Sequence, residues 1–197
     1  MDFLNREKYG VVVTENLQAT QWGGHIVSLI DESQDVQNGW FGHVGFKFNG
    51  EREISEFVTP TTASLATKPA VLVANPVEIF YAPTPEGMLE YYFINLKGKI
   101  FRAYNLYAGD EFALTEYTVD TILPYDKATN TGGAVAGNFV VLQDGSNRLL
   151  EVAAEPTGVA FYGEIIDVDS TPIRPYIMIN GERAPRFIGI RVVKNSV

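Results

Sequence analysis

The sequence contains no cysteine, and this absence removes several kinds of chemistry at once. Disulfide bonds, thiolate catalysis and cysteine-based zinc sites all need a sulfur that the chain does not supply. Histidine is nearly as scarce: His25 and His43 are far apart in the sequence, and no acidic residue lies four positions from either. Two isolated histidines do not form a metal-binding pattern, so we predict no metal site.

Long apolar runs and a surplus of positive charge are also missing. The 24 acidic residues outnumber the 15 basic ones, giving a net charge of −9. Such a surface repels phosphate backbones, so we expect no nucleic-acid partner. The apolar runs are too short to span a membrane, and residues 1–10 lack the apolar segment of a signal peptide. We therefore expect a protein that folds in the cytoplasm of the cell that makes it, without export.

Catalytic motifs are absent as well. The chain has no Gly-x-Ser-x-Gly elbow, and Ser146 lies in an Asp-Gly-Ser-Asn sequence that predicts a hairpin loop. The glycine-rich residues 132–137 lack the lysine and the hydroxyl residue of a phosphate loop. Asp167 and Asp169 share one strand face, where a solvated face explains them better than a calcium site or a glycosidase pair.

We therefore predict a protein that is not an enzyme and that has no catalytic, cofactor-binding or metal-binding residues. The enzyme alternative would require a site assembled from Asp167, Asp169, His25 or His43.

The chain is rich in glycine, with 18 residues, and in short β-favouring runs separated by turn signals. Asn49-Gly50 favours a tight hairpin turn between residues 40–48 and residues 51–58, because both turn residues tolerate positive φ. The alternating pattern IGIRVV near the C-terminus predicts a strand. The spacing of the turns predicts an all-β fold, an antiparallel barrel or sandwich with about ten to twelve short strands.

Three segments stand apart from this pattern. Residues 59–69 are rich in Thr, Pro and Ala and predict a loop or linker within a β domain that covers residues 25–197. Residues 126–137 predict a surface loop. Residues 1–24 form either an extended N-terminal arm that orders against a partner or an edge strand of the same domain, and the sequence leaves both open.

Aromatic residues make up 12% of the chain and crowd its middle. On a β scaffold they serve as core and rim, or they stay exposed and stack against sugars. The cluster consists of Tyr91, Tyr92, Phe93, Phe101, Tyr104, Tyr107, Phe112 and Tyr117.

Several short phrases follow one another in a familiar order over residues 38–193. They are Gly50-Glu51-Arg52-Glu53, a Pro-Val-Glu-Ile segment at 76–79, Arg102-Ala-Tyr-Asn-Leu, Gly109-Asp110-Glu111-Phe112 and Phe161-Tyr-Gly-Glu-Ile-Ile. In layout the chain resembles the head decoration or capsid-stabilising (cement) proteins of tailed bacteriophages, which are small β-rich virion proteins. The resemblance supplies no catalytic residues.

The resemblance implies a protein on the exterior of the capsid that bridges neighbouring coat subunits, often through a terminal arm and commonly as a trimer. Its partners would be the major capsid protein and copies of itself. The candidate capsid contacts are the apolar and aromatic residues of the N-terminal segment: Phe3, Leu4, Tyr9, Val11, Val13 and Trp22. Two alternatives remain open at this point, another virion part such as a tail or head–tail connector protein, and a carbohydrate-binding β-sandwich.

Overall fold

The protein is built almost entirely from β-strands, which confirms the predicted fold class and strand count. The computed structural model describes residues 9–18, 26–76, 93–126, 131–168 and 186–196. Within these ranges lie twelve strands, a one-turn helix α2 (Thr62–Leu65) and two short 3-10 segments, η2 (Phe48–Gly50) and η5 (Glu116–Thr118). The strands are β1 (Val12–Asn16), β2 (Ile26–Ile30), β3 (Phe41–Lys47), β4 (Ile54–Val58), β5 (Val71–Val73), β6 (Ile100–Asn105), β7 (Glu111–Thr115), β8 (Val119–Asp120), β9 (Phe139–Gln143), β10 (Ser146–Val152), β11 (Phe161–Val168) and β12 (Phe187–Asn195).

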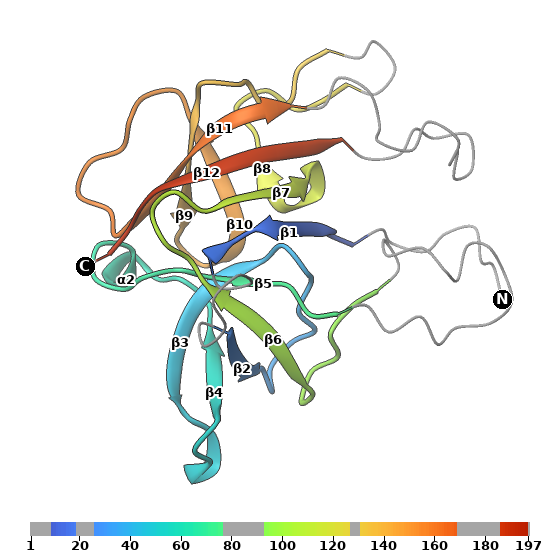
Figure 1. The fold of residues 1–197 in the computed structure, drawn as a ribbon, viewed down its shortest axis with the longest axis vertical. Coiled ribbons are helices and arrows are strands. Elements are labelled where there is room, and N and C mark those ends of the chain that lie inside the picture. Colours follow the sequence, from blue (N-terminus) through green and yellow to red (C-terminus); the bar gives the residue numbers. More distant parts are fainter. Residues whose placement is uncertain (1–8, 19–25, 77–92, 127–130, 169–185, 197) are drawn as a thin grey trace, which may run out of the picture.

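The strands form two bodies that share one chain (Figure 1). The first is a seven-stranded sheet in the order β1-β7-β12-β11-β9-β10-β8. The second is a closed barrel in the order β2-β4-β3-β5-β6. Pairing is antiparallel except between β10 and β8 and between β2 and β4. The predicted choice between barrel and sandwich therefore resolves into a barrel with a sheet packed against it.

Two hydrophobic cores follow from this arrangement. One fills the barrel and includes Leu29, Phe57 and Phe101, and the other lies between the barrel wall and the seven-stranded sheet. Strand β5 is buried along its whole length because its two faces serve different cores. Val71 and Val73 point into the barrel, whereas Leu72 packs in the second core.

Aromatic and amide contacts join the two bodies. Phe41, at the start of β3, packs against Phe112 and Phe161 of the sheet, with ring centroids 5.9 and 5.6 Å apart. Asn195, at the end of β12, accepts a hydrogen bond from the backbone N–H of Ala70 at 2.7 Å. Its amide donates to the carbonyl oxygens of Ala70 and Leu106 at 3.0 and 2.9 Å. Strand β12 therefore holds the chain at two points, just before β5 begins and just after β6 ends.

The predicted hairpins are present and their turns explain them. Asn49 and Gly50 both adopt positive φ, 46° and 77°, and the N–H of Glu51 donates to the Phe48 carbonyl at 2.8 Å. The second hairpin joins β9 to β10 through Asp144 and Gly145. Its loop is shorter than the four residues predicted, since Ser146 already pairs with Gln143 in the ladder.

Residues 59–69 are a packed connection and not a free linker. They contain α2, where Thr61 and Ser64 form a reciprocal capping box and Ser64 is buried. The N–H of Gly145 donates to the Pro60 carbonyl and that of Ala160 to the Leu65 carbonyl, at 2.9 and 2.8 Å. These bonds fasten the connection to the seven-stranded sheet.

Candidate functional site

A single buried glutamate organises one end of the seven-stranded sheet. Glu151 on β10 is only 2% exposed, and its carboxylate accepts three hydrogen bonds. The N–H of Ile122 donates to Oε2 at 3.0 Å, and the N–H of Val135 donates to Oε1 at 2.9 Å. Asn138 Nδ2 also donates to Oε1, at 2.7 Å. Glu151 thereby fixes two loops, residues 121–126 and residues 131–138, to the strand beneath them.

These loops expose large aliphatic side chains. Ile122, Leu123 and Val135 are 51%, 60% and 52% exposed, and we call these three residues the loop surface. The N–H of Gly133 donates to the Leu123 carbonyl at 2.9 Å, which ties the two loops directly to each other. The loop surface is therefore held by backbone hydrogen bonds while its side chains face water.

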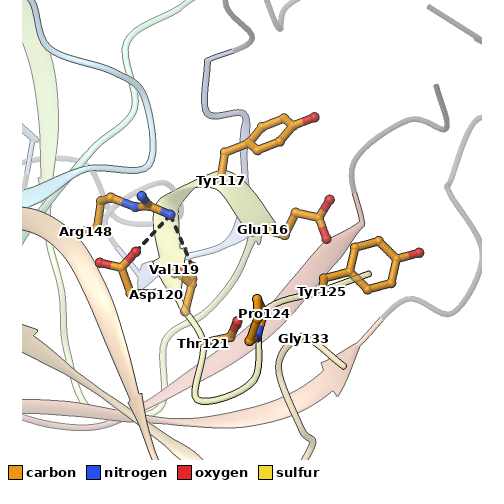
Figure 2. Close-up of a pocket in the computed structure, with 9 residues that line it drawn as sticks. All are labelled: Glu116, Tyr117, Val119, Asp120, Thr121, Pro124, Tyr125, Gly133 and Arg148. Atoms are coloured by element: carbon orange, nitrogen blue, oxygen red, sulfur yellow. Dashed lines mark hydrogen bonds and ion pairs between the residues drawn. The ribbon is translucent and has the colours of Figure 1, made fainter. Parts of the chain in front are cut away.

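A cavity of about 330 Å³ opens beside the loop surface. Figure 2 shows Arg148 and Asp120 on one side of it and the rings of Tyr117 and Tyr125 on the other, with the Glu116 side chain between the two rings. The complete lining is Glu116, Tyr117, Val119, Asp120, Thr121, Pro124, Tyr125, Gly133 and Arg148.

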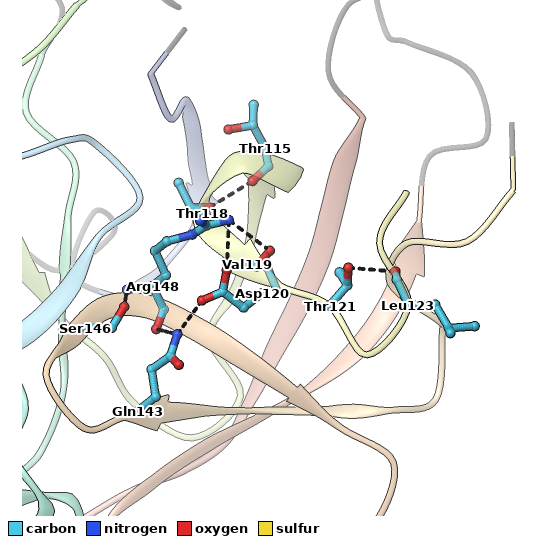
Figure 3. Close-up of polar contacts among 9 residues, drawn as sticks. All are labelled: Thr115, Thr118, Val119, Asp120, Thr121, Leu123, Gln143, Ser146 and Arg148. Carbon is cyan, nitrogen blue, oxygen red and sulfur yellow. Dashed lines mark hydrogen bonds and ion pairs between the residues drawn. The ribbon is translucent and has the colours of Figure 1, made fainter. Parts of the chain in front are cut away.

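An ion pair fixes the first wall of the cavity. Arg148 Nη2 lies 3.0 Å from Asp120 Oδ1, and Gln143 Nε2 donates to Asp120 Oδ2 at 2.6 Å (Figure 3). Both side chains of the pair are about two-fifths exposed, at 42% and 38%. Each carboxylate oxygen of Asp120 is thereby oriented by a partner on β9 or β10.

A second ion pair fixes the opposite wall. Arg186 Nε lies 3.5 Å from Glu116 Oε2, and both side chains are only 11% exposed. The guanidinium also lies over the ring of Tyr125, 3.6 Å from its centroid, in a cation–π contact. Gly133 makes room for this arrangement: its φ is +81°, and a Cβ atom there would meet Arg186 Nη2.

The hairpin of β3 and β4 carries a further exposed aromatic side chain. Phe46 is 84% exposed, and Val44, two residues earlier on β3, is 37% exposed. Figure 1 shows this hairpin extending away from the seven-stranded sheet.

His43 and Ser64 form a hydrogen-bonded pair that resembles part of a hydrolase site. His43 Nε2 lies 2.9 Å from Ser64 Oγ, and Nδ1 lies 2.9 Å from the Pro69 carbonyl oxygen, which requires a proton on Nδ1. Both side chains are buried, and Ser64 Oγ also accepts the N–H of Thr61 at 2.8 Å. Burial lowers the pKa of His43 below its ordinary value, and the nearby Lys68 adds to this while the Pro69 hydrogen bond opposes it. The pair anchors α2 to β3 and offers no open position to a substrate.

The predicted capsid-contact residues fall into two groups. Phe3, Leu4 and Trp22 lie outside the described residues. Tyr9 and Val13 are half-buried, whereas Val11 is only 6% exposed.

The chain itself buries the Val11 side chain, while the prediction that these residues contact a capsid stays a prediction. Residues Val12–Asn16 form β1, which pairs with β7 at the edge of the sheet, and Val11 and Thr115 exchange hydrogen bonds beside it. Residues 12–16 are therefore an edge strand of the sheet and not a free arm.

The residues of the enzyme alternative do not gather in the described part of the chain. Asp167 is exposed on β11, His43 is buried in the barrel wall, and His25 and Asp169 lie outside the described residues. In the same ranges, no group of three or more His, Asp or Glu side chains could hold a metal ion.

Three of the six described members of the aromatic cluster are core residues, and Phe93 and Tyr107 are half-buried. Phe101, Tyr104 and Phe112 are buried, while Tyr117 lines the cavity. Tyr91 and Tyr92 lie outside the described residues. The sequence patterns did not indicate Tyr125, Arg186 or Glu151 as site residues. Burial of Glu151 could have been predicted, because strand alternation places it on the same face as the apolar Leu149.

No family model, curated protein or solved structure matches the chain. In the ranges that the structure describes, no helix has the length and apolar character needed to cross a membrane.

Proposed function

We propose that the chain is a non-enzymatic virion structural protein that decorates the outside of a tailed-phage head and stabilises it. The observation that carries the proposal is the loop surface. Ile122, Leu123 and Val135 are each more than half exposed, yet the backbone that carries them is anchored on a buried carboxylate. Grouped exposed aliphatic side chains on a fixed backbone are typical of a protein-binding surface.

The partner we propose is the major capsid protein, bound by a homo-oligomer of this chain, for which a trimer is favoured. The resemblance in layout to cement proteins supports this choice. A small apolar contact of this kind suits a symmetric shell, because repetition around the shell multiplies weak contacts into stable attachment. The exposed Phe46 on the β3–β4 hairpin offers a second contact at a distance from the first.

The test uses heads of the phage that encodes the chain, prepared without it. Purified protein is expected to co-sediment with these heads and to raise their disruption temperature in a scanning calorimeter. The double variant Leu123→Ser, Val135→Ser is expected to bind at least about tenfold more weakly, because it removes most of the apolar contact area. Ile100→Ser is the matched control, since Ile100 is 54% exposed on the barrel strand β6.

Three results would contradict the proposal or the observation that carries it. If the protein binds no head form, the decoration role fails. If labelled protein is found on the tail or at the head–tail connector of purified particles, the chain is another virion part. Equal binding by the double variant and by Ile100→Ser would remove the loop surface from the contact.

A further inference from the structure

The cavity beside the loop surface has the chemistry of a small-ligand site. We propose that it binds one unit of an uncharged saccharide between the tyrosine rings and the Arg148–Asp120 pair. The proposal goes beyond the decoration role and does not rest on it. Three features carry it: the charge balance of the walls, the polar groups that remain available, and the rings.

The charges of the cavity are already balanced within the chain. Glu116 is paired with Arg186, and Asp120 is paired with Arg148. A cationic ligand would have to compete with a bound arginine for either carboxylate. An anionic ligand would meet two carboxylates and gain little from arginines that are already paired. The walls therefore favour a ligand with no net charge.

The Arg148–Asp120 pair retains hydrogen-bonding capacity for such a ligand. A carboxylate has about four acceptor positions, and Asp120 uses one on Arg148 Nη2 and one on Gln143 Nε2. Arg148 uses Nη2 for Asp120 and for the Val119 carbonyl, and within the described residues Nη1 donates no hydrogen bond. An acceptor and a donor thus lie side by side in a partly exposed pair. Neighbouring hydroxyl groups of a sugar match this combination, because a hydroxyl both donates and accepts.

The tyrosine rings supply the apolar part of the site. A pyranose presents a face of C–H groups, which packs on an aromatic ring while the ring hydroxyl groups stay polar. Tyr125 is held in place by Arg186 at 3.6 Å, so its ring is oriented before any ligand binds. The volume of about 330 Å³ lies near the lower end of the range for ligand pockets. A single sugar ring fits this space better than an extended chain.

The test is a titration of the ¹⁵N-labelled full chain, followed by amide shifts. The neutral probes are glucose, galactose, mannose, N-acetylglucosamine and N-acetylgalactosamine, extended by an array of neutral glycans. Phosphate and free lysine serve as the charged probes. We expect saturable binding of at least one neutral saccharide in the millimolar range or tighter, with shifts at the amides of Thr121 and Gly133.

Variants locate the binding. Tyr117→Ala and Asp120→Ala are each expected to weaken it about tenfold. Thr121→Trp fills the cavity without removing either partner and is expected to abolish binding. Asp167→Ala, an exposed aspartate on another strand, is the matched control and should bind as the parent chain does. Preserved amide dispersion checks that each variant is folded.

Three outcomes would overturn the proposal. The first is no saturable shift with any neutral saccharide in the panel or array. The second is binding that survives both Tyr117→Ala and Thr121→Trp. The third is a preference for phosphate or lysine, which would assign the cavity to a charged ligand or to a charged side chain of a protein partner. Because the titration uses the isolated chain, its result is independent of head binding.

Discussion

Replacing Glu151 by glutamine tests how the loop surface is held. The substitution keeps the shape of the side chain but exchanges one acceptor oxygen for an NH₂ group, which cannot accept the N–H of Ile122 or Val135. A hydrogen bond to a charged group contributes about 1.5–3 kcal/mol net, and a buried N–H left without a partner costs a similar amount. We therefore expect Glu151→Gln to lower the free energy of unfolding by about 2–3 kcal/mol, which lowers Tm by roughly 5–10 °C for a chain of this size.

The assay is urea and thermal unfolding monitored by circular dichroism, combined with amide hydrogen exchange. Exchange at Ile122 and Val135 should accelerate more than exchange in the barrel, because the loss is local. Glu56→Gln is the matched control, as Glu56 is exposed on β4, and it should change stability by less than about 0.5 kcal/mol. If the two variants are equally stable and exchange is unchanged, Glu151 does not anchor the loops.

Three further substitutions examine other parts of the structure. Gly133→Ala should destabilise the chain by about 1–3 kcal/mol in urea unfolding, because a positive φ and a Cβ against Arg186 both oppose it; an unchanged midpoint would contradict the packing described. Phe41→Ala should cost about 3–5 kcal/mol by the same assay, since it empties the centre of the second core, and a loss below 1 kcal/mol would refute that role. The free energy of unfolding should fall as pH drops below the ordinary His43 pKa of 6.5: the unfolded chain binds a proton there, whereas the folded chain, with its lowered pKa, resists it. His43→Gln should make the free energy of unfolding depend less on pH than in the parent chain. Equal pH dependence in the two chains would contradict the role given to His43.

Local chemistry made the hairpins predictable. Asn49-Gly50 forms its turn because both residues accept positive φ, and the alternation in β12 places Ile188, Ile190 and Val192 on one buried face. These features depend on neighbours in the sequence. The all-β class followed from counting such signals.

The closure of the barrel and the cavity depend on contacts between distant residues. The parallel pairing of β2 with β4 has no sequence signature. It arises because β4 folds back along β3 and comes to lie beside β2. Gly133 and Arg186 meet across the fold, so neither residue type indicates a site on its own. The N-terminal segment shows the same limit, because the place of residues 12–16 at the edge of the sheet comes from pairing with β7, which is distant in the sequence.

The three residues of β5 link the stability of the two bodies. Val71 and Val73 belong to the core of the barrel, and Leu72 belongs to the second core. Detaching β5 from its neighbouring strands would therefore disrupt both cores. The barrel and the sheet should therefore melt in one cooperative transition, although they look like two modules. The chain could not be divided at β5 into independently folding halves, and an insertion there would disrupt both.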